Sequence, residues 1–219
     1  MSDMLWLLRH PLETRIRKEL RMASTDILTP QDWTEVVSPP AELVEAVSAL
    51  VPAGDGPLTT AQLVQLSADV AAREDLWRPL VVADTERRRY RLLYEDDRVD
   101  TWLIMWMPGQ GTGYHDHAIS GVGLVGVDGA VVEKQMRLPH GSSDVEVREG
   151  VTREGPAGYI HSVAHVEGSP AITIHSYSPP LMEVAQYRVD EHGVLRRETE
   201  HGRRELIDNT IAEIAPDIV

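Results

Sequence analysis

Two histidines one residue apart are the first feature of the sequence that could bind a metal ion. His115 and His117 follow a glycine-rich run that begins at Gly109, and they enclose Asp116. Side chains alternate between the two faces of a β-strand, so both imidazoles would point to one side and the aspartate to the other. Neutral imidazoles suit divalent iron, nickel, copper and zinc. Taken alone, however, an HxH pair is more typical of a polar loop.

A glycine lies at a fixed distance on each side of this pair. Five residues separate Gly109 from His115, four separate His117 from Val122, and six separate Val122 from Gly129. The segment resembles the first motif of the cupin family: a glycine, five residues, HxH, three or four residues, a glutamate, six residues and a glycine. The glutamate position is the one departure, because it is occupied by Val122.

A second segment contains a third histidine at a similarly regular spacing. Gly150 is followed by five residues, Pro156, one residue, Gly158, two residues and His161, and His165 comes after three more. This order resembles the second cupin motif, which ends in an asparagine where this chain has His165. That histidine is either a neighbour of the metal ligand or a substitute that fills the place of the asparagine. Matches in two separated segments are hard to produce by chance.

The resemblance implies a metal site built from three neutral histidines, His115, His117 and His161. Three ligands on one face leave coordination positions open for a substrate and for oxygen. Without the glutamate of the motif, the metal keeps its full positive charge, which favours an anionic partner such as a thiolate. Among cupins, this ligand set is that of the cysteine dioxygenase-like thiol dioxygenases, which the sequence resembles beyond the metal motif.

The segment AITIHSYSPP, residues 171–180, is similar to a stretch of that group that ends in Tyr-Ser-Pro-Pro. There, a hydroxyl residue, a histidine and a tyrosine at alternating positions form a relay beside the metal. They correspond to Thr173, His175 and Tyr177, with threonine in place of the more usual serine. Alternation along a strand places all three on one face. The resemblance therefore implies a catalytic relay, which we favour over an ordinary core tyrosine.

An arginine that binds the carboxylate of the substrate is expected in RRYRLLY, residues 88–94. The resemblance favours Arg91, with Arg89 second because it would share the strand face, and a plain surface arginine is the alternative. A bidentate guanidinium–carboxylate pair suits the role. Eukaryotic members also crosslink a cysteine, at the position of Val122, to the relay tyrosine. This chain has no cysteine, which excludes that crosslink, disulfides and thiolate metal sites.

The composition describes an acidic protein with enough apolar residues for a buried core. The 219 residues carry a formal charge of -14, from 21 basic and 35 acidic side chains, and 42% of them are hydrophobic. This charge argues against nucleic acid or an anionic membrane as a partner. The apolar run LWLL, residues 5–8, is too short for a signal peptide or a membrane span. We therefore expect a cytoplasmic protein.

Helical and β-rich patterns divide the chain near residue 80. Helical spacing of apolar residues covers 12–23, 41–51 and 60–73, with a shorter turn over 75–77 and Thr59 or Thr60 as a cap. Eight β-rich runs follow, at 88–95, 100–108, 121–127, 130–138, 144–151, 162–168, 171–178 and 182–190. This density of short strands predicts a closed or two-layered antiparallel barrel.

The pattern and the resemblance together predict a mainly β protein. The expected fold is a cupin, a jelly-roll-like antiparallel β-barrel, with an N-terminal helical layer. Residues 1–80 would pack on the barrel as a helical segment, 81–190 would form the barrel with the metal site, and 191–219 would form an extension that wraps the outside. All three parts would belong to one structural domain.

The resemblance implies a mononuclear non-haem iron thiol dioxygenase that uses O2 to oxidise a small thiol, such as L-cysteine, to its sulfinic acid. Fe(II) is the expected metal, with Ni(II) or another divalent ion as the alternative. Two other functions stay open. One is a different metal-dependent cupin oxygenase, for example one that rearranges a thiol oxidatively, and the other is a non-catalytic cupin that binds a small ligand. Ligand binding alone needs no relay, and the oligomeric state stays open.

Overall fold

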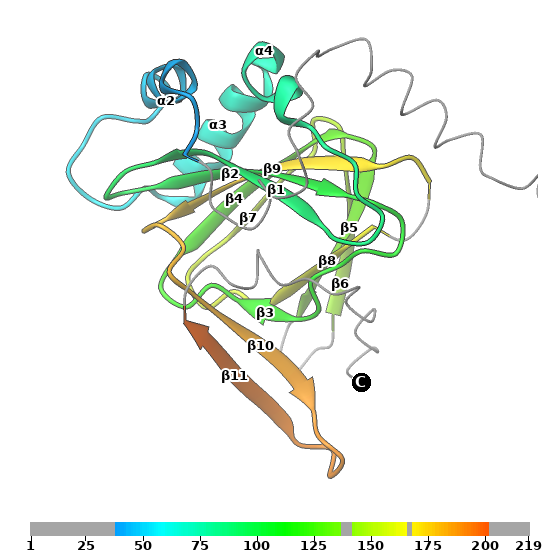
Figure 1. Cartoon of the computed structure of the whole chain (residues 1–219). Helices are drawn as coiled ribbons and strands as arrows, with labels where there is room; N and C mark the ends of the chain where they lie inside the picture. The colour runs from blue at the N-terminus through cyan, green and yellow to red at the C-terminus, as the bar shows by residue number, and fades with distance from the viewer. Residues whose placement is uncertain (1–37, 137–141, 166–167, 202–219) are drawn as a thin grey trace, which may run out of the picture. The chain divides into compact units, whose positions relative to one another are not determined.

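Two antiparallel β-sheets form the framework of the protein in the computed structural model (Figure 1). The structure describes residues 38–136, 142–165 and 168–201, which lie within the compact unit Val36–Val219. The predicted mainly β architecture is confirmed in these residues. The helix predicted over 12–23 and the end of the C-terminal extension, 202–219, lie outside the described residues.

The first sheet has five strands in the order β1, β2, β9, β4 and β7. They are β1 (Arg89–Glu95), β2 (Asp100–Trp106), β9 (Ala171–Ser178), β4 (Gly121–Asp128) and β7 (Thr152–Gly155). Every residue of β2 and β9 is buried. These two strands lie at the centre of the barrel wall, with apolar packing on both faces, so their sequences need not alternate between apolar and polar residues.

The second sheet has six strands in the order β11, β10, β3, β8, β5 and β6. They are β11 (Leu195–His201), β10 (Glu183–Val189), β3 (His115–Asp116), β8 (His161–Ala164), β5 (Ala130–Met136) and β6 (Ser142–Arg148). The pairing of β3 with β8 places His115 directly opposite His161. Strand register thus brings together two of the predicted metal ligands from distant parts of the sequence.

In the described part of the chain, helices precede the first strand. They are α2 (Ala41–Ser48), α3 (Thr60–Ala71), α4 (Glu74–Trp77) and the 3-10 helix η2 (Arg78–Leu80). Their positions agree with the predicted helices over 41–51 and 60–73 and the predicted turn over 75–77. Helix α3 begins with a capping box: the Thr59 hydroxyl accepts from the Gln62 backbone N–H, and the Gln62 side chain accepts from the Thr59 N–H.

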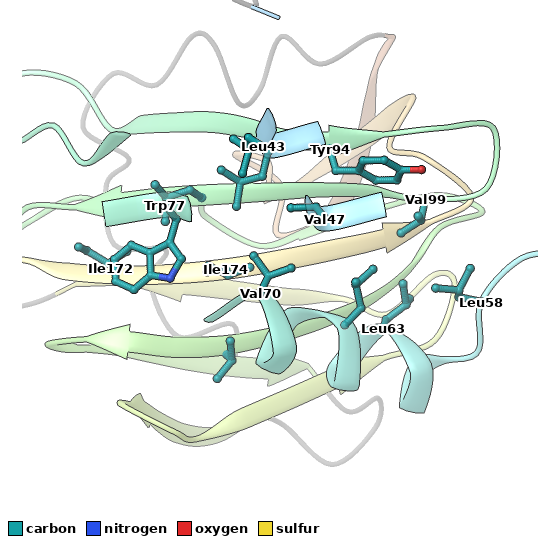
Figure 2. Packing of buried hydrophobic residues seen from close by; sticks show 14 of the residues in the cluster. Leu43, Val47, Leu58, Leu63, Val70, Trp77, Tyr94, Val99, Ile172 and Ile174 are labelled. Carbon is teal, nitrogen blue, oxygen red and sulfur yellow. The ribbon is translucent and has the colours of Figure 1, made fainter. Parts of the chain in front are cut away.

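The helices pack on the outer face of the five-stranded sheet (Figure 2). Val47 of α2 and Leu63 and Val70 of α3 share one buried apolar cluster with Leu103 of β2 and Ile174 of β9. Burial of this helix face supplies the stability that short helices lack on their own. The predicted helical layer is therefore confirmed for the described helices.

Helix α3 comes very close to β4 at Gly123. A Cβ atom at this position would lie 2.3 Å from the backbone nitrogen of Val64, so no larger residue fits without displacing the helix. The Ser67 hydroxyl donates a hydrogen bond to the Gly123 carbonyl over 2.9 Å. This close approach fixes the position of the helical layer on the barrel.

A second apolar cluster fills the space between the two sheets. It includes Trp102 and Leu124 from the five-stranded sheet and Val131, Val163 and Val184 from the six-stranded sheet. Because side chains alternate, the five-stranded sheet divides its residues between this interior and the helix-facing cluster. A residue's strand parity therefore decides whether its side chain can reach the interior of the barrel.

Two predicted elements differ from the structure. The strand predicted over 144–151 is divided, because β6 ends at Arg148 and β7 begins at Thr152. Part of the C-terminal extension forms β11 and pairs along the whole of β10, from Val189 opposite Leu195 to Glu183 opposite His201, where an amphipathic wrap was expected. The turn of this hairpin contains Gly193 with φ of 76°, a conformation that glycine adopts readily.

The described helices include none that is long and apolar enough to cross a membrane. The same part of the chain contains the complete set of residues predicted from the motifs, so their positions can be compared directly with the expectations.

Candidate metal centre and active site

Three histidine side chains converge inside the barrel. His115 lies on β3, His117 follows it, and His161 begins β8, and one ring nitrogen of each lies within 4.8 Å of the others. The Nε2 atoms of His115 and His117 are 3.1 Å apart. All three side chains are buried. These are the three histidines predicted from the motifs, and together they could hold one divalent metal ion.

Hydrogen bonds from the Nδ1 atoms orient two of the rings. His115 Nδ1 lies 3.1 Å from the Gly113 carbonyl oxygen, and His161 Nδ1 lies 2.8 Å from Glu133 Oε1. The Nε2 atom of His161 is buried and has no hydrogen-bond partner among the described residues. A buried nitrogen without a partner is costly, and a metal ion at the centre of the cluster would satisfy it. The donor set therefore fits a bound metal.

The electrostatics of the cluster favour neutral imidazoles. Burial lowers the pKa of His115 and His117 well below the usual range, and the neighbouring histidines lower it further. Neutral imidazole is the form that binds a metal. Burial alone would raise the pKa of Glu133, but its hydrogen bond to His161 and its ion pair with Arg153 lower it to about 2. Glu133 is therefore a carboxylate at neutral pH.

Asp116, between the two ligands of β3, points away from the cluster, as alternation predicts. Arg197 of β11 donates two hydrogen bonds to its carboxylate, over 2.9 and 3.0 Å, and the Tyr187 hydroxyl of β10 donates a third over 2.6 Å. The backbone N–H of Ala118 donates to the same carboxylate over 2.8 Å. The β10–β11 hairpin thus holds the metal-binding strand in place from behind.

A cavity adjoins the three histidines between the two sheets. Its walls are formed by Arg88, Ile104, Trp106, Thr112, His115, His117, His161, Val163, His175, Tyr177, Leu181 and Val184. Arg88 is the only arginine, lysine or acidic residue among these lining residues. The cavity therefore offers a metal-binding corner, one cation and otherwise mostly apolar or aromatic walls.

The predicted relay residues lie on β9 and form a continuous hydrogen-bonded chain. Trp106 Nε1 donates to Thr173 Oγ1 over 2.9 Å, Thr173 Oγ1 lies 3.0 Å from His175 Nε2, and His175 Nδ1 lies 3.1 Å from the Tyr177 hydroxyl. Burial lowers the pKa of His175 to about 3, so its ring is neutral. An indole N–H can only donate, so Thr173 Oγ1 accepts from Trp106, and the tautomer of His175 sets the direction of its bonds to Thr173 and Tyr177.

Tyr177 connects this chain to the metal centre. Its ring contacts the ring of His117, with a centroid distance of 4.9 Å and an interplanar angle of 69°. In the pairing of β4 with β9, Val122 lies directly opposite Tyr177. The residue at the position of the missing glutamate is thus a buried apolar neighbour of the relay tyrosine.

The arginine that lines the cavity is Arg88, whereas the sequence favoured Arg91. Arg88 directly precedes β1, is only 5% exposed, and its Nη1 atom donates to the Gly111 carbonyl over 3.0 Å. Arg91 lies opposite Leu103, which packs in the helix-facing cluster, so its side chain belongs to the other face of the sheet. Arg89 shares that face and forms an ion pair with Asp84.

The comparison with protein families gives a match that includes the whole of this constellation. The sequence matches the family described as cysteine dioxygenase type I over residues 33–190, which is more than half of the chain. The chain belongs to this family. The predicted cupin fold agrees with this membership and with the two antiparallel sheets of the structure.

The curated relatives of this cysteine dioxygenase family member are similar over a shorter stretch. Human cysteine dioxygenase type 1 is 31% identical over 90 residues, covering 36% of this chain and 44% of the human protein. The protein of the same name from Pongo abelii gives the same identity and the same coverage, 36% and 44%. The chain thus spans less than half the length of the curated relatives it matches.

Solved structures with similar folds have low identity to this family member. The protein TT1209 from Thermus thermophilus is 23% identical, with a TM-score of 0.42, covering 47% of this chain and 93% of that protein. An RmlC-like cupin from Desulfovibrio desulfuricans is 19% identical, with a TM-score of 0.40, covering 46% and 90%. The family assignment rests on the family match and not on these two structures.

Sequence reasoning about this family member missed three residues of the site. Arg88 could have been found from strand parity, because Tyr90 and Leu92 pack with the interior cluster, but the apolar pair Leu92–Leu93 obscures which face is inward. Glu133 could have been found as a charged residue at an inward position of β5, next to the buried Val131. Trp106 gave only a weak signal as a pocket residue, because aromatic residues in strands are usually part of the core.

Proposed function

We propose that the protein is a mononuclear non-haem iron thiol dioxygenase that acts on a small thiol with a carboxylate, such as L-cysteine. Both atoms of O2 are added to sulfur, RSH + O2 → RSO2H, so the reaction balances without another reductant. The observation that carries this proposal is the convergence of three buried histidines on a cavity that also holds Arg88 and the Tyr177 relay. Membership of the cysteine dioxygenase type I family supports it.

The ligand set proposed for the metal is His115, His117 and His161. The partnerless Nε2 of His161 and the low pKa of the other two histidines fit a divalent cation, proposed to be Fe(II). When bound, iron supplies a Lewis-acidic centre for the thiolate and the redox chemistry that dioxygen requires. Three imidazole ligands place no negative charge in direct contact with the metal, which favours binding of the substrate as a thiolate.

Arg88 has the proposed role of binding the substrate carboxylate. Its guanidinium carbon lies 4.8 Å from the centroid of the Trp106 ring, and a bond to the Gly111 carbonyl fixes one of its nitrogens. An arginine held in this way presents its guanidinium at a defined place in the cavity. The carboxylate is thereby oriented while the thiol end of the molecule reaches the three histidines.

Tyr177 has the proposed role of a hydrogen-bond donor to the reacting groups of the substrate. The chain from Trp106 through Thr173 and His175 ends with a bond to the Tyr177 oxygen, which orients the phenol beside His117. Tyr177 also lines the cavity, where its hydroxyl would orient the thiol substrate and the oxygen that reacts with it.

The test is metal analysis of the purified protein, followed by oxygen uptake with L-cysteine, 3-mercaptopropionate and cysteamine. We expect one equivalent of O2 consumed per sulfinate formed with a thiol that carries a carboxylate. His161→Ala should abolish metal retention and oxygen uptake, whereas His192→Ala, which changes an exposed histidine of the β10–β11 turn, should change neither. An iron-loaded wild-type protein that consumes no oxygen with any of the three thiols would refute the proposal.

A further inference from the structure

A buried carboxylate lies directly behind one of the three histidines. Glu133 of β5 is 1% exposed, and its Oε1 atom lies 2.8 Å from His161 Nδ1. Arg153 of β7 donates to Glu133 Oε2 over 2.5 Å, and the Tyr159 hydroxyl donates to Oε1 over 3.2 Å. The carboxylate thus has three partners, one of which is part of the metal centre.

The local structure is shaped to hold this carboxylate. Glu133 lies opposite Val163 in the pairing of β5 with β8, so its side chain reaches His161 from the neighbouring strand. The ring of Tyr159 occupies the space where a side chain at position 155 would lie, because a Cβ atom on Gly155 would be 2.4 Å from that ring. The small residue therefore allows the tyrosine to approach Glu133. A buried carboxylate without such partners would be strongly destabilising.

The charge of Glu133 matters because the ligands themselves are neutral. The cupin motif has a glutamate that can serve as a carboxylate ligand, and this chain has Val122 at that position. No acidic side chain lines the cavity in the described part of the chain. Glu133 carries its negative charge one imidazole away from the cluster. Glu133 accepts a hydrogen bond from His161 Nδ1–H, which fixes the tautomer whose Nε2 lone pair faces the other histidines. The same hydrogen bond makes Nε2 a stronger electron-pair donor to a metal ion.

We propose that Glu133 is a positioning residue that supplies, through His161, the anionic character that a carboxylate ligand would otherwise give the metal, and that Arg153 moderates this effect. The proposal rests on the metal site of the proposed function but not on a particular substrate. Glu133 makes the site more electron-rich. Arg153 withdraws part of that charge through its ion pair, so the two residues act on the metal in opposite directions.

The experiment compares the wild type with Glu133→Gln, Arg153→Gln and the control Glu146→Gln, which removes the same charge from an exposed position of β6. Two quantities are measured: the Zn(II) dissociation constant by chelator competition, and the Fe(III)/Fe(II) reduction potential of the iron-loaded proteins. Glu133→Gln should weaken Zn(II) binding by about 10- to 100-fold and raise the potential. Arg153→Gln should lower the potential and bind Zn(II) no more weakly than the wild type.

The opposite signs separate the proposal from a purely structural role. Loosening of the site would weaken Zn(II) binding in both variants and would not move the two potentials in opposite directions. Equal potentials in all four proteins, or shifts of the same sign in the two variants, would overturn the proposal. If Glu133→Gln does not fold, Arg153→Gln must still lower the potential and Arg153→Lys must restore it. Neither measurement involves a thiol, so inactive wild-type protein would refute the proposed function without affecting this result.

Discussion

Replacing Arg88 with glutamine should impair the oxidation of thiols that carry a carboxylate while sparing thiols that lack one. The guanidinium is buried, bonded to the Gly111 carbonyl and placed 4.8 Å from the centroid of the Trp106 ring. Glutamine keeps much of the length and polarity of the side chain but removes the positive charge. The loss should therefore follow the charge of the substrate and not its thiol.

The burial of Arg88 sets the size of the effect. Truncating one partner of a buried, hydrogen-bonded charge pair costs about 2–5 kcal/mol. The cavity must admit substrate and solvent, so the lower end of this range applies, about 2–3 kcal/mol. That energy corresponds to a decrease in kcat/KM of about 30- to 150-fold for 3-mercaptopropionate. Cysteamine has no carboxylate, and its kcat/KM should remain near the wild-type value.

The assay is oxygen uptake at equal iron loading, with both thiols measured for Arg88→Gln and for the control Arg91→Gln. Arg91 shares the helix-facing side of β1 with Arg89 and lies opposite Leu103, so its replacement should leave the ratio of the two activities unchanged. The reasoning fails if Arg88→Gln slows both thiols equally. It fails equally if Arg91→Gln reproduces the selective loss, because the carboxylate site would then lie elsewhere.

Three further predictions follow from the same geometry. Tyr177→Phe should keep Zn(II) affinity but lower kcat by about 10²-fold or more, the usual contribution of a placed proton donor, and an unchanged kcat would exclude that role. Gly123→Ala should lower Tm by about 3–10 °C through overpacking against α3, whereas substitution of the open Gly56 should not. The free energy of unfolding of the metal-free protein should fall as pH decreases below about 6.5, because the unfolded chain then binds protons that the folded chain does not. Each buried neutral histidine should contribute about 1.4 kcal/mol per pH unit to this loss. Because the pKa of His175 in the folded protein is about 3, its ring stays neutral while the same histidine in the unfolded chain becomes protonated. The unfolding free energy, measured by urea denaturation, should therefore fall less steeply with decreasing pH in His175→Gln than in the wild type.

The convergence of the three histidines could be predicted because it depends on spacing along the chain. The motifs fix the distances from Gly109 to His115 and from Gly150 to His161, and the fold converts these distances into the pairing of β3 with β8. The relay residues were assigned from the resemblance, and strand alternation predicted that Thr173 and the two residues that continue the relay share one face of β9. Both features are local in sequence or carried by a motif.

Strand parity and contacts between strands could not be predicted in the same way. The resemblance favoured Arg91 and then Arg89, and strand parity could not correct this choice, because β1 has apolar residues at consecutive positions and no alternation marks its inward face. The contact between Glu133 and His161 joins strands whose register is set only after the sheet has formed. β11 was missed because its charged residues are typical of a solvated surface, whereas Arg197 uses its charge to hold Asp116.

The candidate active site is divided between the two sheets, and this division has a consequence for the proposed catalysis. The three histidines belong to or adjoin strands of the six-stranded sheet, whereas the relay lies on β9 of the five-stranded sheet. The contact between His117 and Tyr177 therefore crosses the interior of the barrel, and its 4.9 Å separation depends on the apolar side chains that space the two sheets. Close-packed interiors respond even to the loss of one methylene group. Trimming an interior residue far from the substrate, such as Val131, should thus change kcat through the distance between metal site and relay, whereas trimming the helix-facing cluster should mainly affect stability.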